Sequence, residues 1–460
     1  MLDWTKLLNE GRRKDKARGT SKSIGTKGSR TEMERDYDRI LFATPTRRLA
    51  DKTQVFPMDS SDSVRTRLTH SMEVSNLARS IGNTLAFEYA EEVFGENHED
   101  LGVKRKVPAL LAAIGLAHDL GNPPFGHQGE VAMSVWFKDK QASEDDGVMN
   151  LHKDFLDFDG NPQTFRLLTK LQILNDNFGL NLTFGTLAAI VKYPVLWNSK
   201  NENKYKKSGI FESERDAIEE VWNETGLSEG QRHPLTYVME ACDDIAYAVI
   251  DAEDTVKKGY ASFYDLMEHL KLHKDDEIVA KVLEDTEEKN REYRKNDGLS
   301  SSELNEISMQ MFRVHAIYHL IDEVTKYFVD ICPKIMNEEI SSNFELIKSS
   351  KGKIFCQALK DFDKKYAFNN KNVLRLELVG HNHIVSTMDM LWAAISKEKS
   401  PFARYATHLI SENYRRVHQS STQNPEYKNC QLLCDSISGM TDKYLVSFHN
   451  DLKSLYDGLS

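Results

Sequence analysis

The sequence has little cysteine, no long apolar run and no excess of positive charge. Its five cysteines are odd in number and form no C-x-x-C pair, which argues against a disulfide framework and fits a reducing compartment. No stretch approaches the ~18 uninterrupted apolar residues of a membrane span. The first residues, MLDWTK, are not followed by the apolar core of an export signal. We therefore expect a cytoplasmic protein with no membrane contact.

The balance of charge also limits the function. A formal net charge of −11 argues against a protein whose whole surface binds nucleic acid, because neutralising phosphates needs concentrated Lys and Arg. Hydrophobic residues make up 40% of the chain and charged residues 28%, as in an ordinary globular protein rather than a disordered one. The 460 residues exceed the ~100 to 200 of a typical domain, so one large domain and a core with added lobes are both open.

Positive charge is concentrated near the N-terminus. Residues 11–30, GRRKDKARGTSKSIGTKGSR, are basic, rich in Gly and Ser and almost without apolar residues, which predicts a flexible arm. A solvated leader is the simpler interpretation, because most basic runs are only solvated. The alternative is an arm that contacts phosphates or bridges subunits. We assign the arm to residues 1–35.

Helical periodicity dominates the rest of the chain, with no run of alternating Val, Ile and Thr and no internal repeat. The spacing of apolar residues predicts helices over residues 64–94, 107–120, 163–174, 187–191 and 235–256. The pattern indicates an all-α fold.

Two polar stretches interrupt this pattern. Residues 198–208, rich in Lys and Asn, predict an exposed loop. Residues 274–302 are mostly charged and predict an exposed helix that ends in a loop at 296–302. We place a boundary there, between a core at 36–295 and an appended C-terminal helical lobe at 296–460.

Four residues are candidate metal ligands: His70, the adjacent His118 and Asp119 in GLAHDLGNPPFGH, and Asp243 in MEACDDIAY. Imidazole nitrogens and carboxylate oxygens suit a divalent first-row metal, and four ligands leave coordination positions open for water and a substrate oxygen. Each residue alone is a weak signal, because a single His on an apolar helix is more often a packed core residue. The setting strengthens it, since the His-Asp pair ends an apolar helix at a Gly-Asn-Pro-Pro turn and a buried pair needs a partner.

Beyond this turn lie His127 and Glu130, three residues apart on one helical face. Attack of water on phosphorus requires a proton acceptor and a donor for the leaving oxygen, and a His oriented by a carboxylate supplies such a group. On spacing alone, a helix cap with surface charge is an equally good interpretation.

The predicted helix at 235–256 places Asp243, Tyr247 and Asp251 at i, i+4 and i+8, on one stripe. If Asp243 holds a metal, Tyr247 can pack on a sugar and Asp251 can accept a hydrogen bond from a hydroxyl further along a pocket wall. A solvated face is the alternative, which Tyr247 fits poorly.

Together these residues resemble the HD superfamily, and specifically the deoxyguanosinetriphosphate triphosphohydrolases. The resemblance rests on blocks between Arg30 and Asp254, and DSISGMTDKY at 435–444 is also similar to the family. The blocks are RTEMERDYDRILFATPTRRLADKTQVFP, RTRLTHSMEVSNLARSIG, AHDLGNPPFGHQGE, NPQTFRLL, LNLTFGTLAAIVKYP and RHPLTYVMEACDDIAYAVIDAED.

The resemblance implies a helical HD-domain core and a metal-dependent enzyme that hydrolyses dGTP, or dNTPs more broadly, at the α-phosphorus to deoxynucleoside and intact triphosphate. It implies metal ligation by His70, His118, Asp119 and Asp243, and a catalytic pair of His127 and Glu130. It further implies these substrate contacts: Gln54 and Asp251 near the 3′-hydroxyl, Tyr247 against the sugar, and Arg67, Lys192, Tyr193 and Lys207 around the triphosphate. Close packing of Tyr247 against the sugar would exclude a 2′-hydroxyl. Arg67 lies one helical turn before His70, so guanidinium and metal can face the same phosphate.

Other functions and partners remain open. The same metal site serves many phosphate esters, so another HD nucleotide phosphohydrolase is an alternative. A regulatory nucleic-acid-binding protein with an idle site, and the basic arm as its contact, is another. The resemblance implies homo-oligomers, often hexamers, and binding of single-stranded DNA by some members.

The identity of the metal is also open. Ligation by two His and two Asp suits Mn²⁺, Mg²⁺, Fe²⁺, Co²⁺ or Ni²⁺, of which we expect Mn²⁺ or Mg²⁺ to support activity. Cys430 and Cys434 lie one helical turn apart and could belong to a second metal site, but two free buried thiols are the favoured interpretation.

Overall fold

The computed structural model describes residues 1–19, 29–54, 65–142, 151–172, 176–295, 298–396 and 400–456. Within these ranges the chain forms helices and no strand, apart from isolated bridges that pair Arg12 with Thr183 and Thr53 with Thr66. The all-α fold predicted from the helical periodicity is confirmed.

The chain up to Lys257 supplies most of the helices around the candidate site. They are α1 (Trp4–Leu7), α2 (Arg13–Ala17), α3 (Glu32–Leu41), α4 (Thr44–Arg48), η1 (Leu49–Asp51), α5 (Arg67–Phe87), α6 (Ala90–Phe94), α7 (His98–Leu101), α8 (Val103–Ala117), α9 (Gly126–Ala142), α10 (Lys153–Leu156), α11 (Gly160–Arg166), η2 (Leu167–Leu171), α12 (Phe184–Ala189), η3 (Glu202–Lys204), η4 (Glu212–Glu214), α13 (Arg215–Thr225) and α14 (Pro234–Lys257).

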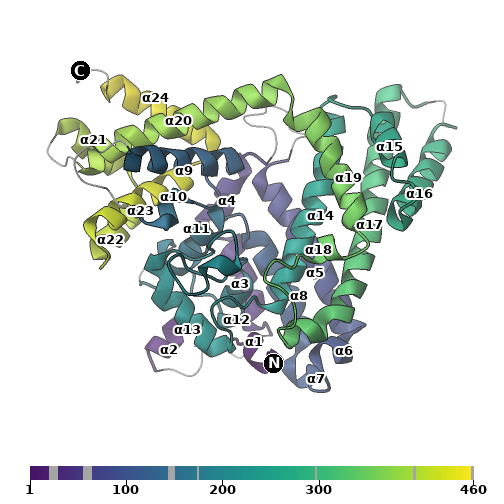
Figure 1. The fold of residues 1–460 in the computed structure, drawn as a ribbon, viewed down its shortest axis with the longest axis horizontal. Helices are drawn as coiled ribbons and strands as arrows, with labels where there is room; N and C mark the ends of the chain where they lie inside the picture. Colours follow the sequence, from purple (N-terminus) through teal and green to yellow (C-terminus); the bar gives the residue numbers. More distant parts are fainter. Residues whose placement is uncertain are drawn as a thin grey trace.

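The second half extends this assembly on two sides. Its helices are α15 (Phe263–Lys271), α16 (Glu277–Tyr293), α17 (Ser301–Met336), α18 (Leu346–Ser349), α19 (Lys353–Asp363), η5 (Lys364–Phe368), α20 (Lys371–Ser396), α21 (Pro401–Leu409), α22 (Glu412–Ser420), α23 (Pro425–Ser438) and α24 (Asp442–Tyr456). In Figure 1, α15 to α17 lie at the right, whereas α20 crosses the top of the view above α9. Helices α21 to α24 gather at the left.

Helices α5, α8 and α14 pack against one another and form the centre of the core. The backbones of α5 and α8 approach closely, because a Cβ at Gly115 would lie 2.8 Å from the Cα of Ser75. The Ser75 hydroxyl also donates a hydrogen bond of 2.8 Å to the carbonyl of Ala112. This contact brings the N-terminal part of α5 beside the C-terminal end of α8. The candidate ligands on these two helices are thereby brought together.

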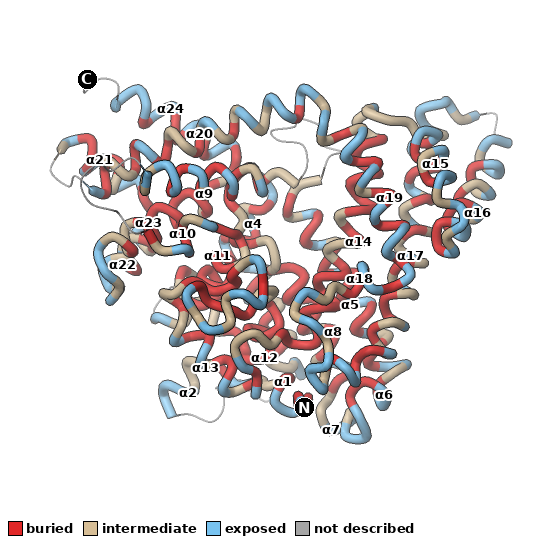
Figure 2. Tube along the Cα trace, in the orientation of Figure 1, coloured by how far each residue is buried: buried red, intermediate tan, exposed pale blue. Residues whose placement is uncertain are grey.

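One hydrophobic cluster of buried residues extends from Leu2 to Leu452, so helices from both ends of the chain share it. Figure 2 shows the buried positions concentrated in the central helices, with exposed positions on the outer faces of α16 and α20. The predicted boundary between core and lobe falls at residues 296–297, which lie outside the described ranges. The three-part division therefore stays a prediction.

The predicted helices at 107–120 and 235–256 correspond to α8 and α14. The single helix predicted at 64–94 is divided into α5 and α6, and residues 55–64 lie outside the described ranges. The predicted loop at 198–208 contains only the short helix η3, as expected, but it is not wholly exposed, because Tyr205 and Ser208 are buried.

The prediction of a wholly solvated N-terminal arm is wrong at Arg12, which is 2% exposed. Its guanidinium donates a 2.7 Å hydrogen bond to buried Asp36 and a 3.0 Å bond to Glu32. The charge is buried because these carboxylates neutralise it. Helix α2 follows directly, and residues 20–28 of the predicted arm lie outside the described ranges.

All five cysteines belong to the described chain, and each is buried and free, as expected for Cys430 and Cys434. None of the described helices combines the length and the apolar character that crossing a membrane would require.

Candidate active site

A cavity of about 520 Å³ brings together nearly all the side chains predicted to form the site. Its lining includes Gln54, Arg67, His70, His118, Asp119, His127, Glu130, Lys192, Tyr193, Lys207, Asp243 and Tyr247. Asp251 is the exception: it is buried on α14 and is not among the described residues that line the cavity. Residues far apart in the sequence thus form one pocket.

The four candidate ligands lie at the floor of this cavity. Donor atoms of His70, His118 and Asp119 all lie within 4.8 Å of one another. The Oδ1 atom of Asp243 lies 3.1 Å from Nε2 of His70 and 3.4 Å from Nε2 of His118. These are the two-nitrogen, two-carboxylate donors that a divalent first-row metal accepts.

The His118 ring is prepared for ligation by its backbone. Its Nδ1 atom lies 2.7 Å from the carbonyl of Gly115. Because a carbonyl only accepts, Nδ1 carries the hydrogen and Nε2 of the neutral ring keeps its lone pair. This Nε2 atom is buried and has no hydrogen-bond partner among the described residues. An orphaned buried nitrogen beside two carboxylates fits a bound cation.

Electrostatics in the cluster favour the charged forms of its members. Burial opposes protonation of His118, but Asp119 and Asp243 outweigh it and raise the pKa of the ring to about 9, so a cation that binds at Nε2 displaces a proton from that atom. Burial likewise opposes ionisation of Asp243, whereas His118 and His70 hold its pKa well below the ordinary value. The two acidic side chains are therefore carboxylates, as metal ligation requires.

Asp119 is oriented by two further side chains. Arg67 Nη1 donates a hydrogen bond of 2.6 Å to Oδ2, and Asn122 Nδ2 donates one of 2.6 Å to Oδ1. Burial raises the pKa of Asp119, but the positive charges of Arg67 and His118 lower it by more, so the pKa lies below its ordinary value. The guanidinium thus lies beside the cluster and lines the same cavity.

A tight turn carries the chain from the His-Asp pair to α9. Phe125 and Gly126 adopt left-handed backbone conformations, with φ of 60° and 56°. A Cβ at Gly126 would overlap the Arg67 guanidinium, so a larger residue here would displace that side chain as well as strain the backbone. The turn places His127 in the first turn of α9, facing the cavity.

His127 and Glu130 form the predicted pair. The Nδ1 atom of His127 lies 2.6 Å from Oε2 of Glu130, while Oε1 of Glu130 accepts a 2.8 Å hydrogen bond from the backbone of Gly160. The hydrogen bond to Glu130 raises the pKa of His127. The ring is 85% exposed, so its Nε2 atom is free to meet a substrate.

Lysines line another part of the wall. Lys192 Nζ lies 3.3 Å from Glu240 Oε1, and Lys207 forms an ion pair with Asp159. Tyr193 also lines the cavity, with the Arg232 guanidinium 5.6 Å from the centre of its ring. These cations are placed to attract a polyanion.

Aromatic and amide groups line a further wall. The rings of Tyr247 and Phe368 stack with centroids 6.3 Å apart. Gln54 also lines the cavity, and its buried Oε1 atom has no hydrogen-bond partner in the part of the chain that the structure describes. Asp251 lies on α14 one turn beyond Tyr247, and burial followed by the charge of Asp363 raises its pKa well above the ordinary value.

Several lining residues were not predicted from the sequence. Asn122 and Phe125 belong to the turn that directly follows the His-Asp pair, so their closeness to Asp119 in the sequence could have identified them as lining residues. Phe368, Leu374 and Glu377 come from η5 and α20, more than two hundred residues beyond the His-Asp pair. No local pattern marks these three, because only the tertiary fold brings them to the site.

Known proteins that are similar to this chain belong to one family of hydrolases. A family model described as HD domain matches residues 67–166. The chain is 33% identical to a deoxyguanosinetriphosphate triphosphohydrolase-like protein of Listeria innocua, over 99% of this chain and 100% of that protein. A protein of the same description from Synechocystis is 30% identical over 99% of this chain and 100% of its own. A deoxyguanosinetriphosphate triphosphohydrolase of Enterobacter is 29% identical over 90% of this chain and 92% of its own.

Proposed function

Because the chain belongs to the deoxyguanosinetriphosphate triphosphohydrolase-like family of HD-domain hydrolases, we propose that it cleaves dGTP, and other dNTPs, to deoxynucleoside and inorganic triphosphate. One observation carries the proposal: the cavity joins a His-Asp donor cluster, a His-Glu pair, lysines and a tyrosine wall. Each group matches one part of a deoxynucleoside triphosphate. A cluster alone would suit any phosphate ester.

His70, His118, Asp119 and Asp243 would hold a divalent cation, with Mn²⁺ or Mg²⁺ our choice among the metals that this donor set accepts. When bound, such a cation supplies Lewis-acid stabilisation of charge on phosphoryl oxygens. The residues around the cation site add further positive charge. Arg67 adds a fixed positive charge beside Asp119, where it can bind a phosphate oxygen.

His127 and Glu130 perform the proton transfer in this proposal. Water adds to the α-phosphorus and loses a proton to solvent, while the bond from phosphorus to the 5′-oxygen breaks and leaves an alkoxide that needs a proton. Glu130 holds the Nδ1–H of His127 and stabilises the imidazolium, so the ring can hold a proton at Nε2 and deliver it to the leaving oxygen. The bond from the Gly160 backbone keeps Glu130 in place.

The remaining contacts bind and select the substrate. Lys192 and Lys207 neutralise the triphosphate. Each lysine either breaks its ion pair with a carboxylate, Glu240 or Asp159, or contacts that carboxylate and the triphosphate together. Tyr247 packs on the sugar, and the orphaned oxygen of Gln54 accepts from the 3′-hydroxyl. A sugar packed against Tyr247 has no room for a 2′-hydroxyl, so GTP should be a poor substrate. Asp251 does not line the cavity, so it can bond to the 3′-hydroxyl, as we expected, only if that hydroxyl reaches past the lining residues.

Product analysis tests the proposed function. Purified protein is incubated with each of the four dNTPs and with GTP in Mg²⁺ or Mn²⁺, and the products are separated by anion-exchange chromatography. We expect triphosphate and deoxynucleoside from dGTP, none with Asp119→Ala, and little product from GTP. Phosphate or pyrophosphate would instead identify another HD nucleotide phosphohydrolase. No product under any condition would favour a regulatory protein with an idle site.

Assembly and other partners also belong to this proposal. We also propose a homo-oligomer, as the resemblance to the family implies, and a contact of the basic segment at 11–30 with single-stranded DNA. Light scattering would report the oligomer, and fluorescence anisotropy with a labelled oligonucleotide would report the DNA contact.

A further inference from the structure

The segment at 435–444, DSISGMTDKY, connects α23 to α24 and contributes nothing to the lining of the cavity among the described residues. It nevertheless lies directly behind two parts of the cavity wall. Its residue Asp442, the first of α24, is 2% exposed. A carboxylate buried this deeply requires hydrogen-bond donors.

Asp442 receives its donors from two separate wall segments. Its Oδ2 atom accepts a 2.9 Å hydrogen bond from the backbone of Thr53 and another from the Thr53 hydroxyl. Its Oδ1 atom accepts a 3.0 Å hydrogen bond from the backbone of Phe125. Thr53 precedes Gln54, and Phe125 lies two residues before His127; all four line the cavity. One carboxylate therefore joins the two segments.

A buried lysine makes a second link between the same elements. Lys52 Nζ donates a hydrogen bond of 2.5 Å to the carbonyl of Asn122 and one of 2.7 Å to the carbonyl of Ser438. The side chain of Asn122 in turn orients Asp119. The chain between α23 and α24 is thus linked to the turn on both sides of Pro123 and Pro124: through Lys52 to Asn122, and through Asp442 to Phe125.

The turn needs such support, because Phe125 has a φ of 60°. A bulky residue rarely adopts this left-handed conformation unless its surroundings impose it. Its amide is bonded to Asp442, and its ring packs on α20, where a Cβ at Gly380 would lie 2.5 Å from the ring. Both restraints come from the C-terminal part of the chain. They hold the residue that immediately precedes α9, two positions before His127.

We propose that Asp442 is a positioning residue of the active site, which holds the Gln54 segment and the His127 turn in register. The inference rests on the proposed function only for its kinetic consequence. The hydrogen bonds themselves predict a structural effect that can be measured without substrate.

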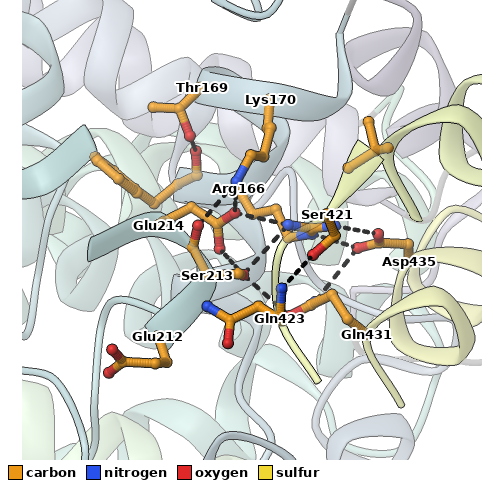
Figure 3. A network of polar contacts seen from close by, with 12 residues as sticks. Arg166, Thr169, Lys170, Glu212, Ser213, Glu214, Ser421, Gln423, Gln431 and Asp435 are labelled. Carbon is orange, nitrogen blue, oxygen red and sulfur yellow. Dashed lines mark hydrogen bonds and ion pairs between the residues drawn. The ribbon is translucent and has the colours of Figure 1, made fainter. Parts of the chain in front are cut away.

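Asp435 provides a matched control within the same segment. It is 1% exposed and pairs with Arg166. The guanidinium of Arg166 donates hydrogen bonds to the Asp435 carboxylate from Nε (2.8 Å) and from Nη2 (2.7 Å). Figure 3 shows this pair beside Glu214, Ser213 and Gln431. The network borders a different cavity, of about 380 Å³. Asp435 therefore matches Asp442 in burial and type, but its partners Gln163 and Arg166 lie on α11, and it bonds directly to neither Thr53 nor the turn at Phe125.

The kinetic test compares Asp442→Asn and Asp442→Ala with Asp435→Asn. We expect kcat/KM for dGTP to fall by at least about tenfold in Asp442→Asn and further in Asp442→Ala, since small displacements of catalytic groups are costly. Asp435→Asn should lower the Tm comparably and keep kcat/KM within about threefold of the wild type. Asp442→Asn with unchanged kcat/KM and a lowered Tm would overturn the proposal.

Amide hydrogen exchange supplies the readout that needs no turnover. In Asp442→Asn the peptide covering residues 120–130 should exchange faster, whereas in Asp435→Asn it should exchange at the wild-type rate. Equal rates in all three proteins would overturn the proposal. If the wild type releases no triphosphate, the proposed function fails while this comparison still decides the role of Asp442. If neither Asp442 variant folds, Thr53→Val removes only the hydroxyl donor, and unchanged exchange at 120–130 and unchanged kcat/KM in it would also overturn the proposal.

Discussion

The ring of His118, a candidate metal ligand, shows how a backbone hydrogen bond can fix the tautomer that metal binding would require. The Gly115 carbonyl selects the tautomer, and neighbouring carboxylates supply the negative charge that a cation needs. Asp119 is oriented in the same way by Arg67 and Asn122. The chemistry of the site thus depends on side chains that contact the ligands as well as on the ligands themselves.

Removal of one such contact should weaken metal binding. In Asn122→Ala the Oδ1 atom of Asp119 loses its donor, and we expect the Kd for Mn²⁺ to rise by about 10 to 100-fold. Isothermal titration calorimetry measures this directly. Asn161→Ala is the control, because Asn161 also lines the cavity but bonds to Asp159, 2.6 Å away. Equal affinities in the two variants would contradict the assigned role of Asn122.

The pH dependence of activity tests His127. Glu130 raises the pKa of the ring, so the protonated form persists to higher pH than in an ordinary histidine. If this form donates the proton, kcat falls as the pH rises through the raised pKa. Glu130→Gln removes the stabilising charge, so the midpoint of the alkaline fall should move to lower pH. A midpoint that does not move would show that the pair does not control the proton transfer.

At the scale of elements, the site depends on how the turn between α8 and α9 is held. Gly121 donates a 2.9 Å hydrogen bond to Thr164 on α11, and a Cβ at Gly121 would overlap the backbone of that helix. Gly126 leaves room for Arg67. Helices α5, α11 and α24 therefore fix the conformation of a few residues between them.

Substitution of Gly126 should lower kcat/KM by more than the accompanying loss of stability from backbone strain would explain. Gly126→Ala places a methyl group on the Arg67 guanidinium as well as an alanine at φ 56°. Gly95→Ala is the control, because Gly95 has a φ of 81° and nothing within 4 Å of its Cβ position among the described residues. Both variants should lose about 1 to 3 kcal/mol of stability. Only Gly126→Ala should lose at least about tenfold in kcat/KM; similar losses in both would contradict the account.

The sequence predicted the local parts of the molecule well. Helical periodicity located α8 and α14, and the short motif around His118 indicated residues that do meet at one cavity. Spacing along α14 could not show that Asp251 is buried below the lining, because depth depends on neighbouring helices such as α19. Composition could not show that Arg12 is buried, because its partners lie on a different helix.

At the scale of the whole molecule, helices beyond α14 complete a site whose candidate ligands all lie on or before α14. Phe368, Leu374 and Glu377 line the cavity, and Asp442 supports it from behind. The similarity to relatives also extends well beyond the HD domain at 67–166. We infer that the C-terminal helices serve substrate binding as well as stability.

Phe368 offers a test of this division of work. Its ring stacks on Tyr247, which we place against the sugar, so Phe368→Ala should weaken binding of substrate and transition state equally. We expect KM for dGTP to rise by about 3 to 10-fold with kcat within about twofold of the wild type. Steady-state kinetics decide the matter. A fall in kcat at unchanged KM would place Phe368 in the chemical step instead.

The most direct test of the account is hydrolysis of dGTP in water enriched in ¹⁸O, with the products analysed by mass spectrometry. Attack at the α-phosphorus predicts one ¹⁸O atom in the released triphosphate and none in the deoxyguanosine. Label in the deoxyguanosine, or release of phosphate or pyrophosphate in place of triphosphate, would contradict the account.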